Sequence, residues 1–204
     1  MATNNSVNAS STGIQVLNST TFIGRTLTGT TNQISISNGD GISGNPTFSL
    51  PANVVNSAAP AFFAYNSAQI TDVTGDGTAY DIVWDAEKFD QASNFNTSTG
   101  IFTAPVAGIY YFSCTLTLTG LLVGHTTATA SFVATSITSL GLQYNPFAIS
   151  TTTSAGFTFN AILSLALNDT VKVQTAVSGS TKTVDIAFNS STNVISSFEG
   201  YLIC

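Results

Sequence analysis

The chain has 204 residues, of which 43% are hydrophobic and only 7% charged, and its formal net charge is −6. Four basic residues cannot form the basic stripe that neutralises a phosphate backbone, so the composition excludes nucleic-acid binding. A pI near 4.2 also argues against an anionic membrane surface, which recruits polybasic segments.

Membrane-spanning and secretory segments are not apparent in the sequence. Residues 1–12 have neither the basic region nor the apolar core of a secretory signal. The most apolar stretch, residues 116–142, is interrupted by Thr, Ser, Gly and His125, whereas a membrane helix needs about 18 uninterrupted apolar residues. We therefore expect no membrane insertion.

Residues 1–55 contain isolated apolar side chains among Asn, Ser, Thr and Gly, too few to pack a core of their own. The alternation in residues 33–37 predicts a strand, residues 38–41 (Asn-Gly-Asp-Gly) predict a tight turn, and residues 47–50 predict a second extended piece. Such a segment is either disordered or shared between chains. We expect a stalk in which three identical chains wrap one another and bury the scattered apolar residues.

Residues 56–204 show a different pattern, with short strands at regular spacing and turn residues between them. The predicted strands are 61–68, 79–85, 100–104, 108–118, 126–135, 142–150, 156–167, 170–177, 182–188 and 195–203. Residues 85–90 could form a helical turn or a charged loop. The pattern predicts one all-β domain built as a two-sheet sandwich.

Three segments of this second region carry a resemblance to a known family: residues 60–65, 100–113 and 197–203. The middle one, with the pattern GxFxAPVxGxYxFS, is the most specific. In it Pro105 ends one strand, Gly108 permits the reversal, and Tyr110 and Phe112 alternate inward on the next strand. Together with the strand–turn–strand pattern of residues 164–171, these segments resemble the C1q/tumour-necrosis-factor-like globular head. The resemblance implies a ten-stranded jelly roll that assembles as a homotrimer.

A second resemblance covers the first region. Residues 25–34, 38–41, 44–46 and 50–51 are similar to repeats of phage tail fibres and of tail-fibre-like bacterial surface fibres, and residues 73–80 resemble the C1q-like tips of such fibres. The Gly-X-Y repeat of collagen is absent, so complement activity is not implied. This resemblance implies an extracellular location, on a virion tail fibre or on a bacterial surface fibre.

The sequence contains few residues of the types that catalyse reactions or bind metal ions. His125 is the sole histidine and no GxSxG elbow accompanies it, which argues against a Ser-His-Asp hydrolase. Cys114 and Cys204 form no Cys-X-X-Cys pair for zinc, and we expect buried thiols rather than a disulfide. We predict no enzyme activity and no required cofactor.

Six of the ten acidic residues cluster between positions 72 and 90. Asp72 and Asp76, in a Gly-rich loop, could supply oxygen ligands to calcium, and C1q-like heads can carry calcium near the trimer axis. The alternative is a solvated loop whose Asp residues stabilise turns. Four aromatic residues nearby are either core and interface residues or a platform for sugar stacking: Tyr80, Trp84, Phe89 and Phe95.

The alternating direction of the strands predicts which loops lie at the end of the head farthest from the stalk. These are residues 69–78, 119–125, 151–155 and 178–181, rich in small neutral side chains. Clefts between protomers are the alternative location for a ligand. The candidate ligand-binding residues at the loops are Asp72, Asp76, Leu121, Leu122, His125, Ser178 and Ser180.

Three hypotheses for the function follow. In the first, the chain is a receptor-binding fibre tip that attaches to a cell-surface glycan or protein, with avidity from three copies. In the second, the head only registers three chains and caps the fibre. The third, a polysaccharide-degrading tip, requires two carboxylates facing one sugar.

Overall fold

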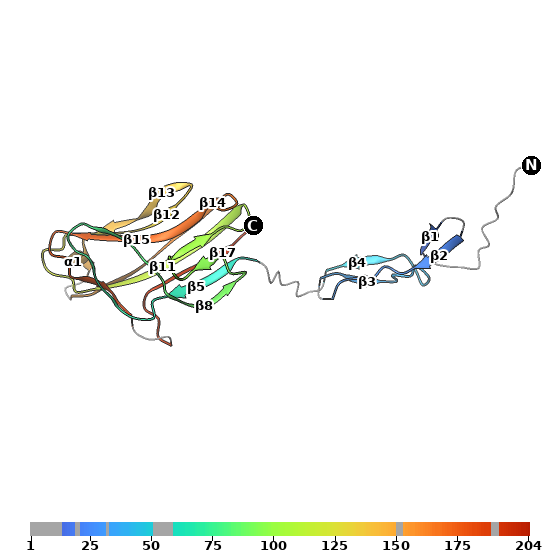
Figure 1. Cartoon of the computed structure of the whole chain (residues 1–204), viewed down its shortest axis with the longest axis horizontal. Coiled ribbons are helices and arrows are strands. Elements are labelled where there is room, and N and C mark those ends of the chain that lie inside the picture. Colours follow the sequence, from blue (N-terminus) through green and yellow to red (C-terminus); the bar gives the residue numbers. More distant parts are fainter. Residues whose placement is uncertain (1–13, 19–20, 32, 51–58, 150–152, 189–191) are drawn as a thin grey trace, which may run out of the picture. The chain divides into compact units, whose positions relative to one another are not determined.

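The structure is a computed structural model of the chain that describes residues 14–18, 21–31, 33–50, 59–149, 153–188 and 192–204 (Figure 1). The chain divides into two compact units, Met1–Asn56 and Ser57–Cys204, here called the N-terminal unit and the head. No helix in the described ranges is long and apolar enough to span a membrane.

The N-terminal unit consists of two small antiparallel pairs. β1 (Ile14–Asn18) pairs with β2 (Thr21–Arg25), and β3 (Ser35–Ser37) pairs with β4 (Thr47–Ser49). The predicted turn after β3 is confirmed, because Asn38 and Gly41 have positive φ angles of 53° and 70° and the amide of Gly41 donates to the carbonyl of Asn38. The strand pair at β1 and β2 was not predicted.

The head is an antiparallel sandwich of two sheets, which confirms the predicted fold class. In the first, the β12 sheet, the spatial order is β13 (Ile137–Tyr144), β12 (Thr127–Ala134), β15 (Thr170–Ser178), β10 (Ile101–Thr103) and β9 (Phe95–Asn96), with β7 (Ala79–Asp81) beside β15. In the second, the β11 sheet, the order is β6 (Ile70–Thr74), β16 (Val184–Ile186), β11 (Gly108–Thr119), β17 (Ser197–Leu202), β5 (Ala61–Tyr65) and β8 (Ala86–Gln91), with β14 (Ala155–Leu165) beside β11.

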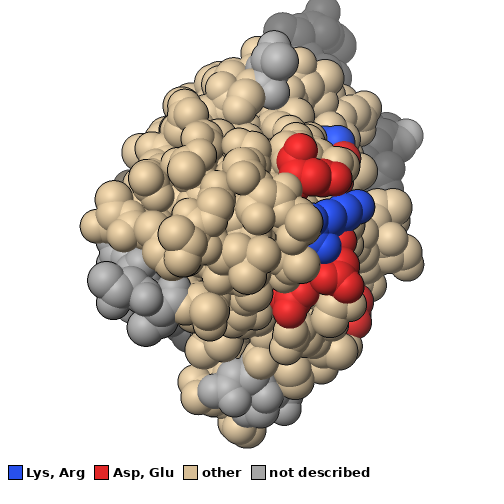
Figure 2. Space-filling model, turned by 90° about the vertical axis from the view of Figure 1, so that its left-hand side faces the viewer, with Lys and Arg blue, Asp and Glu red and all other residues tan. Residues whose placement is uncertain are grey.

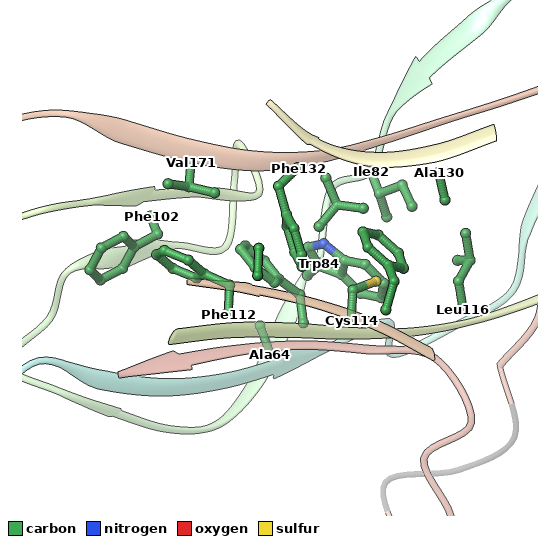
Figure 3. Packing of buried hydrophobic residues seen from close by; sticks show 14 of the residues in the cluster. Ala64, Ile82, Trp84, Phe102, Phe112, Cys114, Leu116, Ala130, Phe132 and Val171 are labelled. Atoms are coloured by element: carbon green, nitrogen blue, oxygen red, sulfur yellow. The ribbon is translucent and has the colours of Figure 1, made fainter. Parts of the chain in front are cut away.

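The core lies between the two sheets and is built mainly of aromatic rings. Alternate residues of β12, β14 and β15 point inward, as expected for strands with one apolar face. Phe62 stacks on Phe102 with ring centroids 5.2 Å apart. Figure 3 shows Phe112, Phe132 and Trp84 filling the space between the sheets, where all three are buried.

The motif of residues 100–113 folds as its pattern predicts. Phe102, Tyr110 and Phe112 are buried, and the hydroxyl group of Tyr110 donates to the carbonyl of Val106 at 2.8 Å. Gly108 begins β11 at a close approach, since a Cβ atom there would lie 2.7 Å from the carbonyl oxygen of Cys204. The motif therefore fixes where β11 starts against the C-terminal segment.

Residues 85–90, predicted as a helical turn or a charged loop, instead belong largely to β8. This strand lies at the edge of the β11 sheet, and its charged residues Glu87 and Lys88 are exposed, whereas Asp90 is half-buried. Charges are common on edge strands because they discourage pairing with other chains, and here they obscured the strand pattern.

Residues 142–150 were predicted as one strand, but β13 ends at Tyr144 and is followed by α1 (Pro146–Ile149). The side-chain oxygen of Asn145 accepts a hydrogen bond from the amide of Phe147, which caps the helix. Pro146 is the first helical residue, where its fixed φ angle favours a helix and its missing amide costs nothing. The strand β6, also not predicted, begins directly after the loop that follows β5.

The burial of the two cysteines and of the four clustered aromatic residues agrees only partly with the predictions. Both cysteines are free, but Cys114 is buried whereas Cys204 is exposed, so the prediction of two buried thiols is wrong for Cys204. Trp84 and Phe95 are core residues and Tyr80 is half-buried against the core, whereas Phe89 is exposed on β8.

Candidate functional site

Hydrogen bonds join four connections at one end of the head, here called the tip loops (residues 75–78, 120–126, 153–154 and 179–183). The amide of Gly75 donates to the carbonyl of Val177, and that of Ser180 donates to the carbonyl of Gly75. The amide of Leu121 donates to the carbonyl of Thr153 at 3.0 Å. The structure thus brings together parts of all four predicted connections at the end with α1 (left in Figure 1). Of the predicted loop 69–78, however, residues 70–74 form β6, and residues 151–152 of the predicted loop 151–155 lie outside the described residues.

Two glycines allow these loops to approach one another closely. Gly75 has a φ of 135°, and a Cβ atom at this position would lie 2.0 Å from the carbonyl oxygen of Thr181. Gly120 has a φ of 69°, and its Cβ would lie 2.1 Å from the carbonyl oxygen of Thr183. Side chains at either position would push the tip loops apart.

His125 was predicted at the ligand-binding surface, but its side chain is buried among the tip loops. Its ring Nδ1 accepts a hydrogen bond from the amide of Leu122 at 2.9 Å, and its Nε2 lies 3.0 Å from the carbonyl oxygen of Thr181. A carbonyl oxygen only accepts, so Nε2 carries the proton and the ring is neutral. The imidazole therefore holds the 120–126 loop against the 179–183 loop.

The predicted apolar pair Leu121 and Leu122 is split between core and surface. Leu121 is buried, so the expectation that its side chain belongs to an exposed apolar patch is wrong. Leu122 is 42% exposed and the next residue, Val123, is 86% exposed. The amide of His125 donates to the carbonyl of Leu122 at 2.9 Å, which closes a tight turn with Val123 at its apex.

Asp72 and Asp76 are both exposed, but only Asp76 lies in a loop, because Asp72 belongs to the strand β6. The amide of Asp72, which has a φ of 54°, donates to Oδ1 of Asp185 at 2.8 Å. Oδ1 of Asp76 accepts from the amide of Thr78 at 3.0 Å, and these bonds to Thr78 hold the pKa of Asp76 below its ordinary value. Among the described residues, no group of three or more His, Cys, Asp or Glu side chains could hold a metal ion.

Ser178 and Ser180 contribute backbone groups to the junction of the tip loops. The carbonyl of Ser178 accepts from the amide of Thr126 at 3.1 Å, and both serines are half-buried. Figure 2 looks onto this end of the head and shows mostly uncharged atoms, with the acidic and basic side chains gathered along one side. The tip is therefore a largely neutral surface with an exposed apolar turn.

A second surface, which sequence reasoning did not assign, lies on the outer side of the β11 sheet. The register places Ile162 of β14, Tyr111 of β11 and Tyr201 of β17 in one row across the sheet, and the two tyrosine rings are 5.3 Å apart. In the next row, Phe63 lies 6.5 Å from Phe89, which is exposed. These five residues are here called the outer aromatic face.

The outer aromatic face leaves large apolar side chains in solvent, with Ile162 exposed by 64%. The signal in the sequence was the pair of adjacent tyrosines in β11. In an alternating strand, one of two consecutive aromatic side chains must point away from the core. Exposed apolar side chains grouped in this way are typical of a surface that another protein covers.

The domain model of the C1q family matches residues 61–203, which cover both sheets and the tip loops. The chain belongs to the C1q domain family. C1q domains are trimeric binding modules that are generally non-enzymatic, and proteins that contain them are generally extracellular. The match does not extend to the N-terminal unit, and the comparisons do not support the resemblance of that unit to a tail-fibre stalk.

Among solved structures, the chain is similar to the globular domain of the zebrafish complement 1qA protein. The two are 20% identical, and the alignment covers 72% of this chain and 98% of that one, with a TM-score of 0.49. No curated protein matches the chain.

Proposed function

We propose that this protein is the trimeric, receptor-binding tip of a fibre and attaches that fibre to a glycan or protein on a cell surface. The observation that carries the proposal is the turn at Leu122 and Val123. Its apolar apex is exposed in solvent although His125, buried beneath it, fixes its backbone through two hydrogen bonds. A rigid exposed apolar turn loses little conformational entropy when a partner covers it.

The trimer in this proposal forms through the outer aromatic face. The family assembles as trimers, and apolar side chains such as Ile162 and Tyr201 are enriched in the centres of protein interfaces relative to exposed surfaces. The ion pair between Lys172 and Asp81 lies on the other sheet. On the outer aromatic face the register places Glu199 beside Phe63, among the apolar side chains. Assembly of three chains in this proposal is driven mainly by apolar burial.

The ligand in this proposal meets neutral hydrogen-bonding groups and an apolar turn rather than a charged patch. Such a surface suits a glycan or a protein loop, and three copies of a weak site multiply the affinity when they engage one cell together. The extracellular location that is general in the family agrees with this role.

The N-terminal unit supplies the stalk in this proposal. Its described apolar side chains remain outside any core: Phe48 is 63% exposed and Leu50 is 70% exposed. Chains that wrap around one another would bury these residues without a core in each chain. The whole protein then belongs to a fibre of a virion tail or of a bacterial surface.

The test compares substitutions at the tip and away from it. Val123→Asp places a charge at the apex of the exposed turn and should abolish attachment to target cells while leaving the trimer intact. Leu167→Asp is the matched control, because Leu167 is also exposed but lies in the turn after β14, at the end of that strand opposite the tip loops. Attachment is measured as retention of labelled protein on a panel of bacterial cells and on immobilised glycans.

The same measurement separates the alternatives. If Val123→Asp and the control bind cells equally well, the head is a structural cap that registers three chains, or the ligand lies in the clefts between protomers. Release of reducing sugar from a bound polysaccharide would instead indicate a degrading tip. Neither result is expected.

A further inference from the structure

A hollow of about 430 Å³ lies outside the tip loops, between the end of β5 and the start of β6 on one side and residues 83–85 on the other. Asn66, Gln69, Thr71, Val83 and Asp85 contribute to its lining. The volume falls in the range of ligand sites, roughly 300–1,000 Å³, and far exceeds that of a single water.

Asn66, one of the residues that line this hollow, has a side-chain acceptor without a hydrogen-bond partner. The side chain is only 2% exposed, and its Nδ2 donates to the carbonyl oxygen of Val83 at 2.9 Å. This bond fixes the orientation of the amide, because a backbone carbonyl can only accept. The remaining oxygen, Oδ1, is buried and has no partner in the described part of the chain. Buried polar atoms of this kind are rare, and a donor from a ligand would satisfy the oxygen.

Asp85 adds a negative charge to the same hollow. One carboxylate oxygen accepts from the amide of Ser67 at 2.6 Å and the other accepts from the hydroxyl group of Ser67, so the carboxylate is held in place. Each oxygen retains a lone pair that can accept a further bond. Asp85 forms no ion pair with any described residue.

Gln69 extends the acceptor-rich lining. Its Nε2 donates to Oδ2 of Asp185 at 2.7 Å, which leaves the amide oxygen of Gln69 as an acceptor. A ligand here must therefore be rich in donors, and the fixed carboxylate of Asp85 favours a positively charged one. A metal ion is disfavoured, since no three acidic, His or Cys side chains among the described residues converge on one point.

We propose that this hollow binds an amino sugar, with its ammonium group bonded to Asp85 and its hydroxyl groups bonded to Asn66, Gln69 and Thr71. A lysine side chain carries the same ammonium group. However, the apolar stem of lysine would leave the amide oxygen of Asn66 and the hydroxyl group of Thr71 without partners. This site is separate from the tip loops and does not depend on the function proposed for them.

The test uses saturation-transfer NMR on the full chain, with D-glucosamine as the probe and with D-glucose, N-acetyl-D-glucosamine and lysine amide as comparisons. Glucosamine should give a saturable signal, and Asp85→Asn should weaken its binding by about ten-fold, the loss expected for one charge-assisted bond. Glu87→Gln is the matched control, because Glu87 is an exposed carboxylate close to Asp85 in the chain that does not line the hollow, and this variant should bind normally.

Several outcomes would overturn the proposal. Equal signals from glucose or N-acetylglucosamine would show that the ammonium group is not recognised, and stronger binding of lysine amide would indicate a basic peptide instead. Displacement of glucosamine by calcium chloride would indicate a cation site. Asp85 is exposed and Asn at this position keeps an acceptor for Ser67, so the variant should fold, which its native mass verifies. Attachment of Val123→Asp to cells is measured separately, so failure of one proposal leaves the other intact.

Discussion

The head and the N-terminal unit are both built from β-strands, but apolar side chains are buried in the head and exposed in the N-terminal unit. In the head, alternate residues of long paired strands meet between two sheets, and rings such as Phe62, Phe112 and Phe198 are fully buried. In the N-terminal unit, β3 and β4 pair over only three residues each, and Phe48 on β4 is largely exposed. A single short strand pair cannot form a core by itself, and the described residues leave Phe48 uncovered.

The two units differ in what lies opposite the apolar face of their strands. An alternating pattern defines an apolar face in both units, but only a second sheet from the same chain converts that face into a core. Where the chain provides no second sheet, the partner must come from another chain. The outer aromatic face of the β11 sheet resembles the β3–β4 pair in this respect, because its apolar side chains are also left exposed by the described residues.

Truncation of a ring in the core of the head should have the largest effect, which is on the free energy of unfolding. Phe112→Ala removes a ring that contacts Phe62, Phe102, Phe132 and Phe198, and should lower the free energy of unfolding by about 3–5 kcal/mol. Denaturant unfolding followed by the fluorescence of Trp84, the sole tryptophan, measures the change. Phe48→Ala is the control, since an exposed ring in the other unit should not alter the unfolding of the head. A similar loss for both variants would contradict the division into two units.

The next effect concerns assembly. Ile162→Asp places a charge in the outer aromatic face, where a partner chain would have to bury it, and should convert trimers to monomers. Light scattering on the purified variant gives the mass. A trimer that tolerates Ile162→Asp would place the contact between chains elsewhere on the head.

A smaller effect is expected on acidification. Burial alone would raise the pKa of Asp81, but the hydrogen bonds from Lys172 and Gln174 and the charge of Lys172 outweigh it and lower the pKa below the ordinary 3.8. A carboxylate with a lowered pKa in the folded state stabilises the fold above its unfolded value, and this stability is lost as the pH falls below about 3.8. Because the pair is nearly half exposed, the loss should be below about 1 kcal/mol.

Thermal unfolding of the wild type and of Asp81→Asn at neutral and acidic pH checks this prediction. The difference between the two proteins should be present at neutral pH and shrink in acid. An Asp81→Asn variant that becomes relatively less stable as the pH falls would have the opposite sign and refute the assignment.

The last prediction concerns the reactivity of the two cysteines toward a thiol reagent and involves no change in stability. Burial, reinforced by the charge of Glu199, raises the pKa of the Cys114 thiol well above its usual range, so this thiol stays protonated and inaccessible. Cys204 is exposed. A thiol reagent should therefore label one cysteine in the native protein and both after denaturation, as mass spectrometry can count. Rapid labelling of both in the native protein would show that the core opens.

The sequence was sufficient to predict the two-sheet sandwich. It also predicted approximately where strands end if apolar and polar residues alternate regularly along them. The motif around Pro105, Gly108 and Tyr110 predicted a reversal and an inward ring, and both are present. It was insufficient for β8, since charged side chains at a sheet edge remove the alternation on which strand prediction depends. The sequence pattern also did not predict α1, because one turn of helix is too short to show a helical period.

The candidate site was predicted at the level of loops and not at the level of side chains. Strand direction alone predicts which connections lie together, and the hydrogen bonds among Gly75, Thr153 and Ser180 follow that prediction. Whether a given loop side chain points outward depends on the turn, which no period reveals. Leu121 and His125 were therefore assigned to the surface although both are buried, while their neighbour Val123 is the most exposed of the three.

The most direct test of the trimeric binding module is the native mass of the full chain in solution. Light scattering should give about 63 kDa, three times the 21.1 kDa of one chain. A fragment starting near Ala59 should also form a trimer if the outer aromatic face carries the assembly. A full chain that remains a monomer at micromolar concentration would contradict both the shared stalk and the covered face, and with them the proposed fibre tip.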